Sequence, residues 1–436
     1  MKNMFDVKAQ VACFLDSGAK LVEEDTPYVN RILRQTFDLE TFHKLNGNVK
    51  YVGVSNTFKE MVDLFCRDEL CTPAGFRIEW NLEKNGLLCV DLIRDIGYEK
   101  NGVARPTSVL FSADCCDPYE IADFKNILVN ITTNPVIIYD RFLTDPKVNV
   151  GNKFKTREEV LMELHRIVGS GADISVELND PFASDEAILE EAESFTKLIP
   201  KSCLVVKVPH FGPLTKENIA LLAVGSFPER YSSATTKSAF RCHNIALMLH
   251  EHGYRVNFTL MFEPYQVALA LQAKPYFINC FVRNRYWMSE EMAKLLGSYD
   301  ATGKEEYLEQ LHKHLIAKDY LCPADAAMSL NQVAQRARDL LTYRGWNGQG
   351  ADGLDEARDA LRQLKSSGLP ESKLIICSMG GDLMYPQLDK MLLEDEFSDM
   401  KHKVVISAAP DYFAQFTSAP DVLTYNRSFA KAALKA

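Results

Sequence analysis

The chain has 436 residues, of which 47% are hydrophobic and 25% charged, which is enough for a large buried core. Its formal net charge of −10 and its pI near 5.5 argue against a general binder of nucleic acids or of anionic membranes. The first six residues lack the apolar segment of a secretory signal, and no apolar run approaches the roughly 20 residues that a membrane-spanning helix needs.

The cysteine content indicates reduced thiols. The chain has 11 cysteines, an odd number, and most lie within apolar runs, as do Cys89, Cys203, Cys280 and Cys377. No CxxC pair and no cluster of histidine and cysteine has the spacing of a zinc site. We therefore expect a cytoplasmic protein without a bound metal.

The N-terminal residues lack the alternation of strands and helices that follows them. Residues 27–45 have a helical pattern, and residues 76–81 and 87–92 predict a hairpin that turns at 83–86. We expect residues 1–105 to form an α+β extension or small domain, and residues 106–436 to form the main domain.

From about Thr107 onward, apolar strand candidates alternate with amphipathic helices. Most of the strands are continuous apolar runs, as expected for strands covered on both faces. They span residues 108–112, 127–131, 173–178, 204–208, 256–260, 276–280, 374–377 and 404–407. Helical periodicity is clearest at 156–168, 184–198 and 353–366. Eight such units predict a (β/α)8 TIM barrel with its active site at the carboxyl ends of the strands.

Two stretches are additional to the strands and helices of a minimal barrel. Residues 224–241, rich in Ser, Thr and Phe, lengthen the connection after the fourth strand. A helical insertion from Asn284 to about Gly350 follows the sixth strand. Its helical segments are expected at 289–296, 304–318 and 324–341. Because it leaves the barrel at the active-site end, it could act as a lid.

Lys207 stands inside the fourth predicted strand, LVVKVP (residues 204–209). Lysine is rarely buried without a partner or a chemical task. Burial disfavours the ammonium form of an amine, and a neutral amine can attack a carbonyl to form a Schiff base. The alternative is a lysine whose ammonium reaches solvent at the strand end.

Polar residues at other strand ends favour the first interpretation. Asp114 follows the first strand, Asn134 the second, Glu177 ends the third, and the fifth contains Asn257 and Thr259. Polar side chains in apolar strands need partners, so several at one end of a barrel predict a site.

Each of these residues also has a purely structural alternative. Asp114 could cap the next helix, although Asp117 is better placed for this role. Asn134 precedes a proline and could be a turn residue. Glu177 could pair with a buried arginine, and Thr259 is a common strand residue.

The stretches ITTNPVII, ISVEL, VVKVP, VNFTLMF and INCFVRNR occur in this order along the chain. In this combination the chain from about Thr107 to Gln415 resembles the transaldolase family. Its members are class I, Schiff-base-forming enzymes on a (β/α)8 barrel that need no metal or organic cofactor. The N-terminal extension lies outside the resemblance.

The resemblance implies a role for each matching residue. Lys207 would attack the carbonyl of a ketose, and Asp114 would move a proton as the aldol bond breaks and forms. Glu177 and Thr259 would hold a water that relays protons during imine formation. The implied substrate-binding residues are Asn134, Asn257 and Ser378.

The pattern departs from the family at the phosphate end of the substrate. Asn279 and Asn284 stand where the family has the serine and the arginine of SPFVGR, and Gly380 stands where it has the arginine of SFR. Arg283 and Arg285 flank the first of these positions and could substitute as substrate-binding residues. Recognition of a phosphate is therefore in question.

The sixth strand also separates transferases from related aldolases. Phe281, together with Glu177, matches the transaldolase pattern, whereas the related aldolases carry Tyr and Gln. We therefore expect transfer of a dihydroxyacetone-type unit from a ketose or ketose phosphate to an aldehyde, as in the pentose phosphate pathway.

Two other functions stay open. One is a class I aldolase that acts on an atypical substrate, for example one without phosphate. The other is a non-catalytic, transaldolase-like scaffold, against which the intact set of Lys207, Asp114, Glu177 and Thr259 argues. The expected partner is a small sugar or sugar phosphate, with no nucleic acid and no membrane, and a homodimer is a possible assembly.

Overall fold

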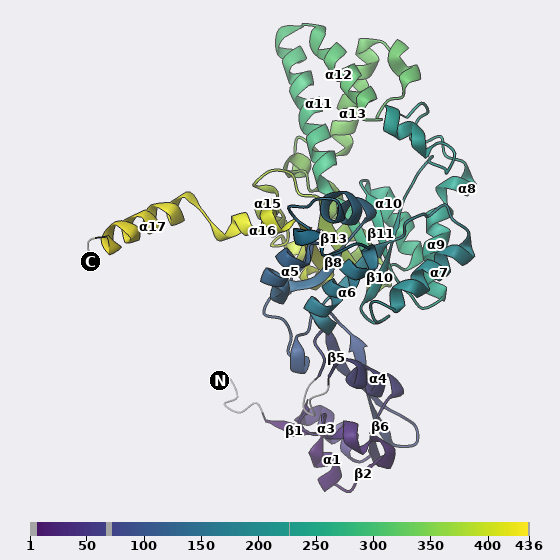
Figure 1. The fold of residues 1–436 in the computed structure, drawn as a ribbon, viewed down its shortest axis with the longest axis vertical. Helices are drawn as coiled ribbons and strands as arrows, with labels where there is room; N and C mark the ends of the chain where they lie inside the picture. The colour runs from purple at the N-terminus through teal and green to yellow at the C-terminus, as the bar shows by residue number, and fades with distance from the viewer. Residues whose placement is uncertain (1–6, 67–71, 226, 435–436) are drawn as a thin grey trace. The chain divides into compact units, whose positions relative to one another are not determined.

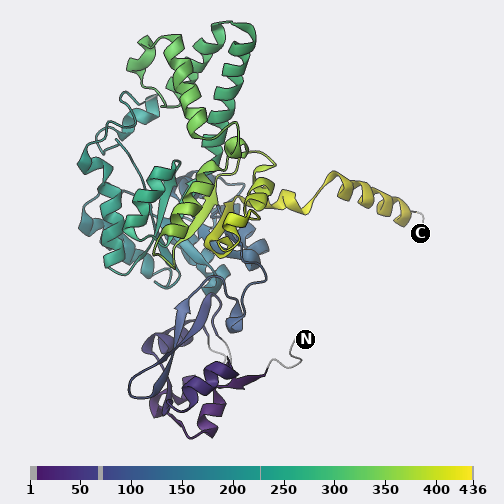
Figure 2. The ribbon, with the colours of Figure 1, turned by 180° about the vertical axis from the view of Figure 1, so that it is seen from behind.

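The structure is a computed structural model, and it describes residues 7–66, 72–225 and 227–434. The chain divides into two compact units (Figures 1 and 2). The first comprises Met1–Ser108, Lys125–Val129 and His165–Asp173, and the second comprises the remaining residues. That the N-terminal part is an independent domain stays a prediction.

Eight parallel strands close a barrel, and their order around the barrel is their order along the chain. They are β7 (Leu110–Ala113), β8 (Leu128–Thr132), β9 (Asp173–Glu177), β10 (Leu204–Pro209), β11 (Arg255–Met261), β12 (Phe277–Phe281), β13 (Lys373–Cys377) and β14 (Val404–Ala408). Each begins and ends within two residues of its expected bounds. The predicted barrel is therefore confirmed.

Helices follow the strands and surround the barrel (Figure 1). They are α5 (Pro118–Phe124), the π-helix η4 (Val136–Leu143), α6 (Arg157–Val168), α7 (Asp185–Thr196), α9 (Arg241–Glu251), α10 (Pro264–Ala270), α14 (Asp355–Ser366), α15 (Met384–Met391) and α16 (Pro410–Ala414). All six residues of β10 are buried, which explains its continuous apolar pattern. A parallel barrel presents the carboxyl ends of all eight strands on one face, where a site can form.

The connection after β10 and the insertion after β12 add further helices. They are η7 (Ile219–Val224), α8 (Thr236–Ala239), α11 (Val282–Thr302), α12 (Glu306–Ala317) and α13 (Leu330–Tyr343). The insertion has its own hydrophobic cluster, to which Met292, Leu311 and Val333 contribute. The first insertion helix is longer than the expected 289–296, because α11 begins directly after β12.

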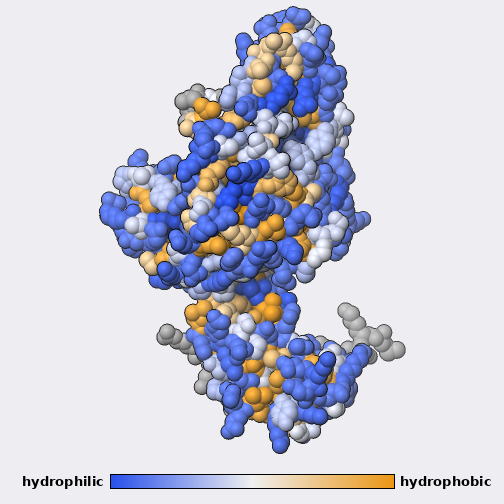
Figure 3. Space-filling model, turned by 90° about the vertical axis from the view of Figure 1, so that its right-hand side faces the viewer, coloured by the Kyte–Doolittle hydropathy of each residue, from blue (hydrophilic) through white to orange (hydrophobic). Residues whose placement is uncertain are grey.

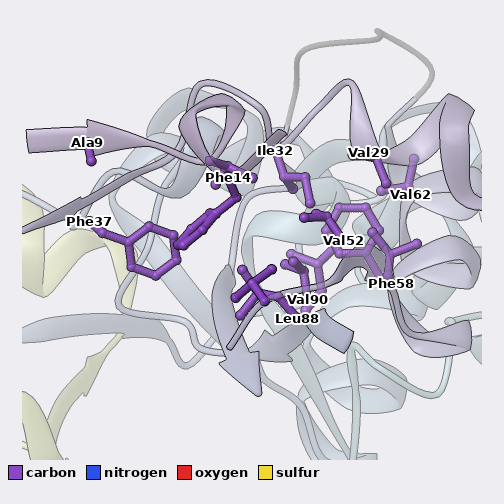
Figure 4. Close-up of a cluster of buried hydrophobic side chains, with 14 of the residues drawn as sticks. Ala9, Phe14, Val29, Ile32, Phe37, Val52, Phe58, Val62, Leu88 and Val90 are labelled. Atoms are coloured by element: carbon purple, nitrogen blue, oxygen red, sulfur yellow. The ribbon is translucent and has the colours of Figure 1, made fainter. Parts of the chain in front are cut away.

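The N-terminal unit contains a four-stranded sheet in the order β2-β4-β6-β5 and a two-stranded pair of β1 and β3. Its elements are β1 (Lys8–Gln10), α1 (Ala12–Asp16), β2 (Lys20–Leu21), α2 (Thr26–Val29), β3 (Thr36–Asp38), α3 (Leu39–Asn46), β4 (Tyr51–Val54), α4 (Asn56–Phe65), β5 (Phe76–Leu82) and β6 (Leu87–Arg94). Its helices and strands enclose one hydrophobic cluster (Figure 4). The predicted hairpin is confirmed as the antiparallel pair β5–β6.

The single helix expected at 27–45 is wrong, because β3 interrupts it. β3 pairs with β1, and Phe37 within it packs its ring 5.5 Å from that of Phe14. Asp38 then starts α3, since its carboxylate accepts a hydrogen bond from the backbone N–H of Thr41 at 2.8 Å. Long-range strand pairing has overridden the local helical pattern here.

The surface in Figure 3 is mostly hydrophilic, with scattered hydrophobic patches. Along the described chain, every helix is too short or too polar to cross a membrane. The cysteines of the described residues are free thiols. The last helix, α17 (Pro420–Ala433), buries none of its residues.

Candidate active site

Lys207 is buried in β10 with only 4% of its surface exposed. Its register partners are Glu177 on β9 and Asn257 on β11. The Nζ atom of Lys207 lies 3.0 Å from Oε2 of Glu177 and donates to the carbonyl oxygen of Thr133 at 3.4 Å. The structural alternative required the ammonium of Lys207 to reach solvent at the strand end. Instead, it is paired with Glu177 inside the barrel.

Asp114 follows β7 and is partly buried. Burial raises the pKa of its carboxyl group, while the charges of Lys207, Arg141 and Arg283 oppose this rise. A raised pKa favours the protonated form of the carboxyl group, and such a group can act as a proton donor and, once deprotonated, as a proton acceptor. The neighbouring Asp117 takes the capping role, because its Oδ1 accepts from the backbone N–H of Tyr119 at 2.8 Å.

A hydrogen-bonded polar layer crosses four strands inside the barrel. Asn257 donates to Ser175 at 3.1 Å, Ser175 donates to Oδ1 of Asn130 at 2.9 Å, and Asn130 donates to Ser112 at 2.8 Å. All four side chains are fully buried. Oδ1 of Asn257 is buried and has no partner among the described residues, so it can accept a further hydrogen bond.

Sequence reasoning singled out Asn257 but missed Asn130. The one signal for Asn130 was a lone amide in the otherwise apolar run LVNI of the second strand. A buried amide must find partners, so this position pointed to a network.

Thr259 is buried on β11, and its Oγ1 accepts from Nδ2 of Asn279 at 3.3 Å. The structure pairs Glu177 with Lys207, and the water expected between Glu177 and Thr259 stays a prediction. The next residue, Leu260, has a left-handed φ of 64°, and the β11–β12 register shifts there. Such a bulge re-aims side chains at the rim of a barrel.

Asn134 has the structural role that the sequence left open. Its Oδ1 accepts from the backbone N–H of Ile137 at 2.8 Å, at the start of η4. That helix carries Arg141, whose charge reaches Asp114. Asn134 thereby helps to place Arg141, which the sequence analysis did not identify.

Ser378 and Phe281 lie at neighbouring strand ends. Ser378 follows β13 with φ of 57°, a left-handed conformation that is uncommon for serine and recurs at functional sites. Its carbonyl oxygen accepts from the backbone N–H of Arg283 at 2.9 Å. Phe281 ends β12, and its ring centroid lies 5.1 Å from that of Phe262.

Arg285 is held by carboxylates, contrary to the substrate-binding role considered for it. It is 2% exposed, and its guanidinium pairs with Glu263 and Asp355. Burial opposes its charge, but the hydrogen bond to Asp355 and the nearby acidic charges raise its pKa overall. Glu263 also binds Arg344 at 3.0 Å, so this cluster joins the insertion to the barrel.

Arg283 is the flanking arginine that faces the site. Its charge reaches Asp114, and its guanidinium lies 5.3 Å from the ring centroid of Trp287. It forms no ion pair with the other described residues. A Cβ atom at Gly380 would come within 3.1 Å of Cγ of Arg283, so the glycine makes room for this side chain.

The chain matches no known protein-family model and no curated protein sequence. Its resemblance to transaldolases therefore rests on the motifs in its sequence. The assignment stays a prediction, and the geometry around Lys207 is the basis on which we judge its chemistry.

Proposed function

We propose that the protein is a transaldolase-like transferase that moves a dihydroxyacetone-type unit from a ketose to an aldehyde through a Schiff base on Lys207. The buried ion pair of Lys207 and Glu177 is the main support for this proposal. A lysine is rarely buried inside a strand without a partner or a chemical role, and the carboxyl end of a barrel is where active sites form. Asp114, with its raised pKa, supplies a second proton-transfer group.

The first stage forms the imine. Glu177 accepts a proton from the Lys207 ammonium, and the neutral amine attacks the ketose carbonyl carbon to give a carbinolamine. Proton return to the carbinolamine hydroxyl lets it leave as water, and the C=N bond forms. The 3.0 Å contact allows this transfer without large movement of either side chain.

The second stage breaks and remakes a carbon–carbon bond. Asp114 takes the proton of the hydroxyl on the carbon β to the imine carbon. The bond between the α and β carbons then breaks, and the β carbon leaves as the carbonyl carbon of an aldehyde. The electron pair of the broken bond is held as an enamine on Lys207. A second aldehyde then accepts this carbon nucleophile, Asp114 returns the proton, and hydrolysis of the new imine releases the product.

Transfer requires that the enamine is not protonated before the acceptor arrives. Phe281 supports this, because its ring packs against Phe262 and brings no hydroxyl to the strand end. An apolar wall also lowers the local supply of water.

Borohydride trapping tests the proposal. The wild-type protein, incubated with a reactive ketose and borohydride, should gain the mass of the reduced adduct, and Lys207→Met should abolish it. Lys373→Met is a matched control, since Lys373 is also a buried strand lysine, 7% exposed at the opposite end of β13. An adduct that persists in Lys207→Met contradicts the assignment.

Trapping with several ketoses, with and without phosphate, distinguishes a transferase from an aldolase and from a non-catalytic scaffold. An aldolase would release the three-carbon unit without an acceptor at a rate that matches transfer. A scaffold without catalysis would give no adduct with any ketose, with or without phosphate.

A further inference from the structure

A cavity of about 660 Å³ lies between the barrel rim and the helical insertion. Phe262 lines it from the segment after β11, Asn284 and Trp287 from the first turns of α11, and His314 from α12. This volume is within the usual range of small-molecule sites, about 300–1,000 Å³. None of the residues assigned above to the chemistry of Lys207 uses this space.

The cavity adjoins the candidate active site through two of its aromatic walls. Phe262 packs on Phe281, the last residue of β12, with 5.1 Å between ring centroids. Trp287 packs under the guanidinium of Arg283, whose charge reaches Asp114. A molecule that occupies the cavity would therefore lie beside the mouth of the barrel.

The base of the cavity is held in place by ion pairs. Arg285 lines it and is bound by Glu263 and Asp355. Arg344 binds Glu263 at 3.0 Å and donates to the hydroxyl of Tyr320, another lining residue, at 2.8 Å. Because these partners come from the barrel and from the insertion, the cavity is formed before any ligand enters.

The lining charges balance one another. Arg285 is neutralised by its carboxylate partners, and Glu291 is paired with Lys294 at 3.1 Å. Glu290 and Lys318 remain, with opposite charges. A phosphate would find no excess of positive charge here.

The polar groups of the lining offer hydrogen bonds without net charge. Asn284 is an exposed amide, and Glu290 accepts from the hydroxyl of Tyr286 at 3.3 Å with capacity for further donors. Burial lowers the pKa of His314, so its ring is neutral at pH 7.

We propose that this cavity binds a neutral, polyhydroxylated group, such as a sugar ring, as the distal part of the acceptor substrate. The aromatic faces of Phe262 and Trp287 pack against the C–H surface of the ring, while Asn284, Glu290 and His314 bond its hydroxyls. The acceptor role rests on the proposed transferase function. Binding itself does not depend on it.

The test is a calorimetric titration of the full chain with maltose, lactose and sorbitol, and with glucose 6-phosphate as the charged probe. We expect at least one neutral probe to bind with Kd of roughly millimolar order. Trp287→Ala and Asn284→Ala should each weaken this binding, the first at least about tenfold, or about 1.4 kcal/mol. Tyr51→Ala is the matched control, since Tyr51 is 44% exposed against 49% for Trp287 and lies in the N-terminal unit.

Lys207→Met separates the two proposals. It should keep the affinity for the neutral probe and lose the borohydride adduct. Absence of binding by every neutral probe up to about 100 mM, well above the expected Kd, overturns the cavity assignment. Binding that neither Trp287→Ala nor Asn284→Ala weakens overturns it equally. Saccharide binding without any ketose adduct on Lys207 supports the cavity assignment and contradicts the proposed transferase function.

Discussion

Replacing Glu177 by Gln should slow imine formation far more than it destabilises the fold. The substitution keeps the size of the side chain but removes the charge that lies 3.0 Å from Nζ of Lys207. Gln cannot accept the proton that Lys207 must lose before it attacks a carbonyl.

The size of the effect follows from this contact. At 3.0 Å and an effective dielectric constant of about 20, two unit charges attract by about 5.5 kcal/mol, most of which offsets the cost of burying them. A positioned proton acceptor contributes about 10²- to 10⁴-fold to a rate. We therefore expect Glu177→Gln to lower the rate of adduct formation by a factor in this range.

The assay is the rate of borohydride trapping measured by intact-protein mass spectrometry, with thermal unfolding followed in parallel. Glu191→Gln is the matched control. Glu191 has the same side-chain exposure of 18%, and it pairs with the buried Arg157 at 3.1 Å, whereas Glu177 pairs with Lys207 at 3.0 Å. The control should lose stability without losing trapping rate. A Glu177→Gln protein that traps within about threefold of wild type would refute a proton-transfer role for Glu177.

Three further predictions concern the site rim and the core. Arg283→Ala should weaken binding of a phosphorylated ketose about 10- to 150-fold, which corresponds to the loss of one charge-assisted hydrogen bond. In competition trapping, binding of the unphosphorylated ketose should be unchanged. Equal effects on both ketoses would contradict a phosphate contact. Burial raises the pKa of Glu356 well above 4.5, so the folded protein holds a proton that the unfolded chain releases. The free energy of unfolding should therefore fall as pH rises from about 4.5 toward the folded-state pKa, by up to about 1.4 kcal/mol per pH unit. Glu356→Gln should flatten this pH dependence in thermal unfolding. An unchanged dependence would mean that other groups cause it. Asn130→Ala removes hydrogen bonds to Ser112 and Ser175, which should cost about 2–4 kcal/mol in urea unfolding, and a loss below about 0.5 kcal/mol would show that the layer is dispensable.

The barrel could be predicted from the sequence because parallel strands buried on both faces give long apolar runs. β10 is the clearest case, since its six residues are all buried and its lysine is the only charge among them. The predicted closeness of Lys207 and Glu177 also holds, because both stand at the carboxyl ends of adjacent strands.

The parts that failed depend on contacts between distant residues. Arg285 finds Asp355 seventy positions away and Glu263 on another strand end, and no local pattern reveals such partners. The link between Asn130 and Ser175 likewise requires the stagger of strands around the closed barrel. Sequence periodicity locates a side chain on a strand but does not say what stands opposite it.

The glycine at position 380 has an evolutionary consequence. Because a Cβ atom there would meet Cγ of Arg283 at 3.1 Å and Nε1 of Trp287 at 3.4 Å, any larger residue requires those side chains to shift. Positions 380 and 283 are therefore energetically coupled, and a change at one alters which residues are tolerated at the other. An arginine at position 380 would therefore require the side chain of Arg283 to be repositioned or removed.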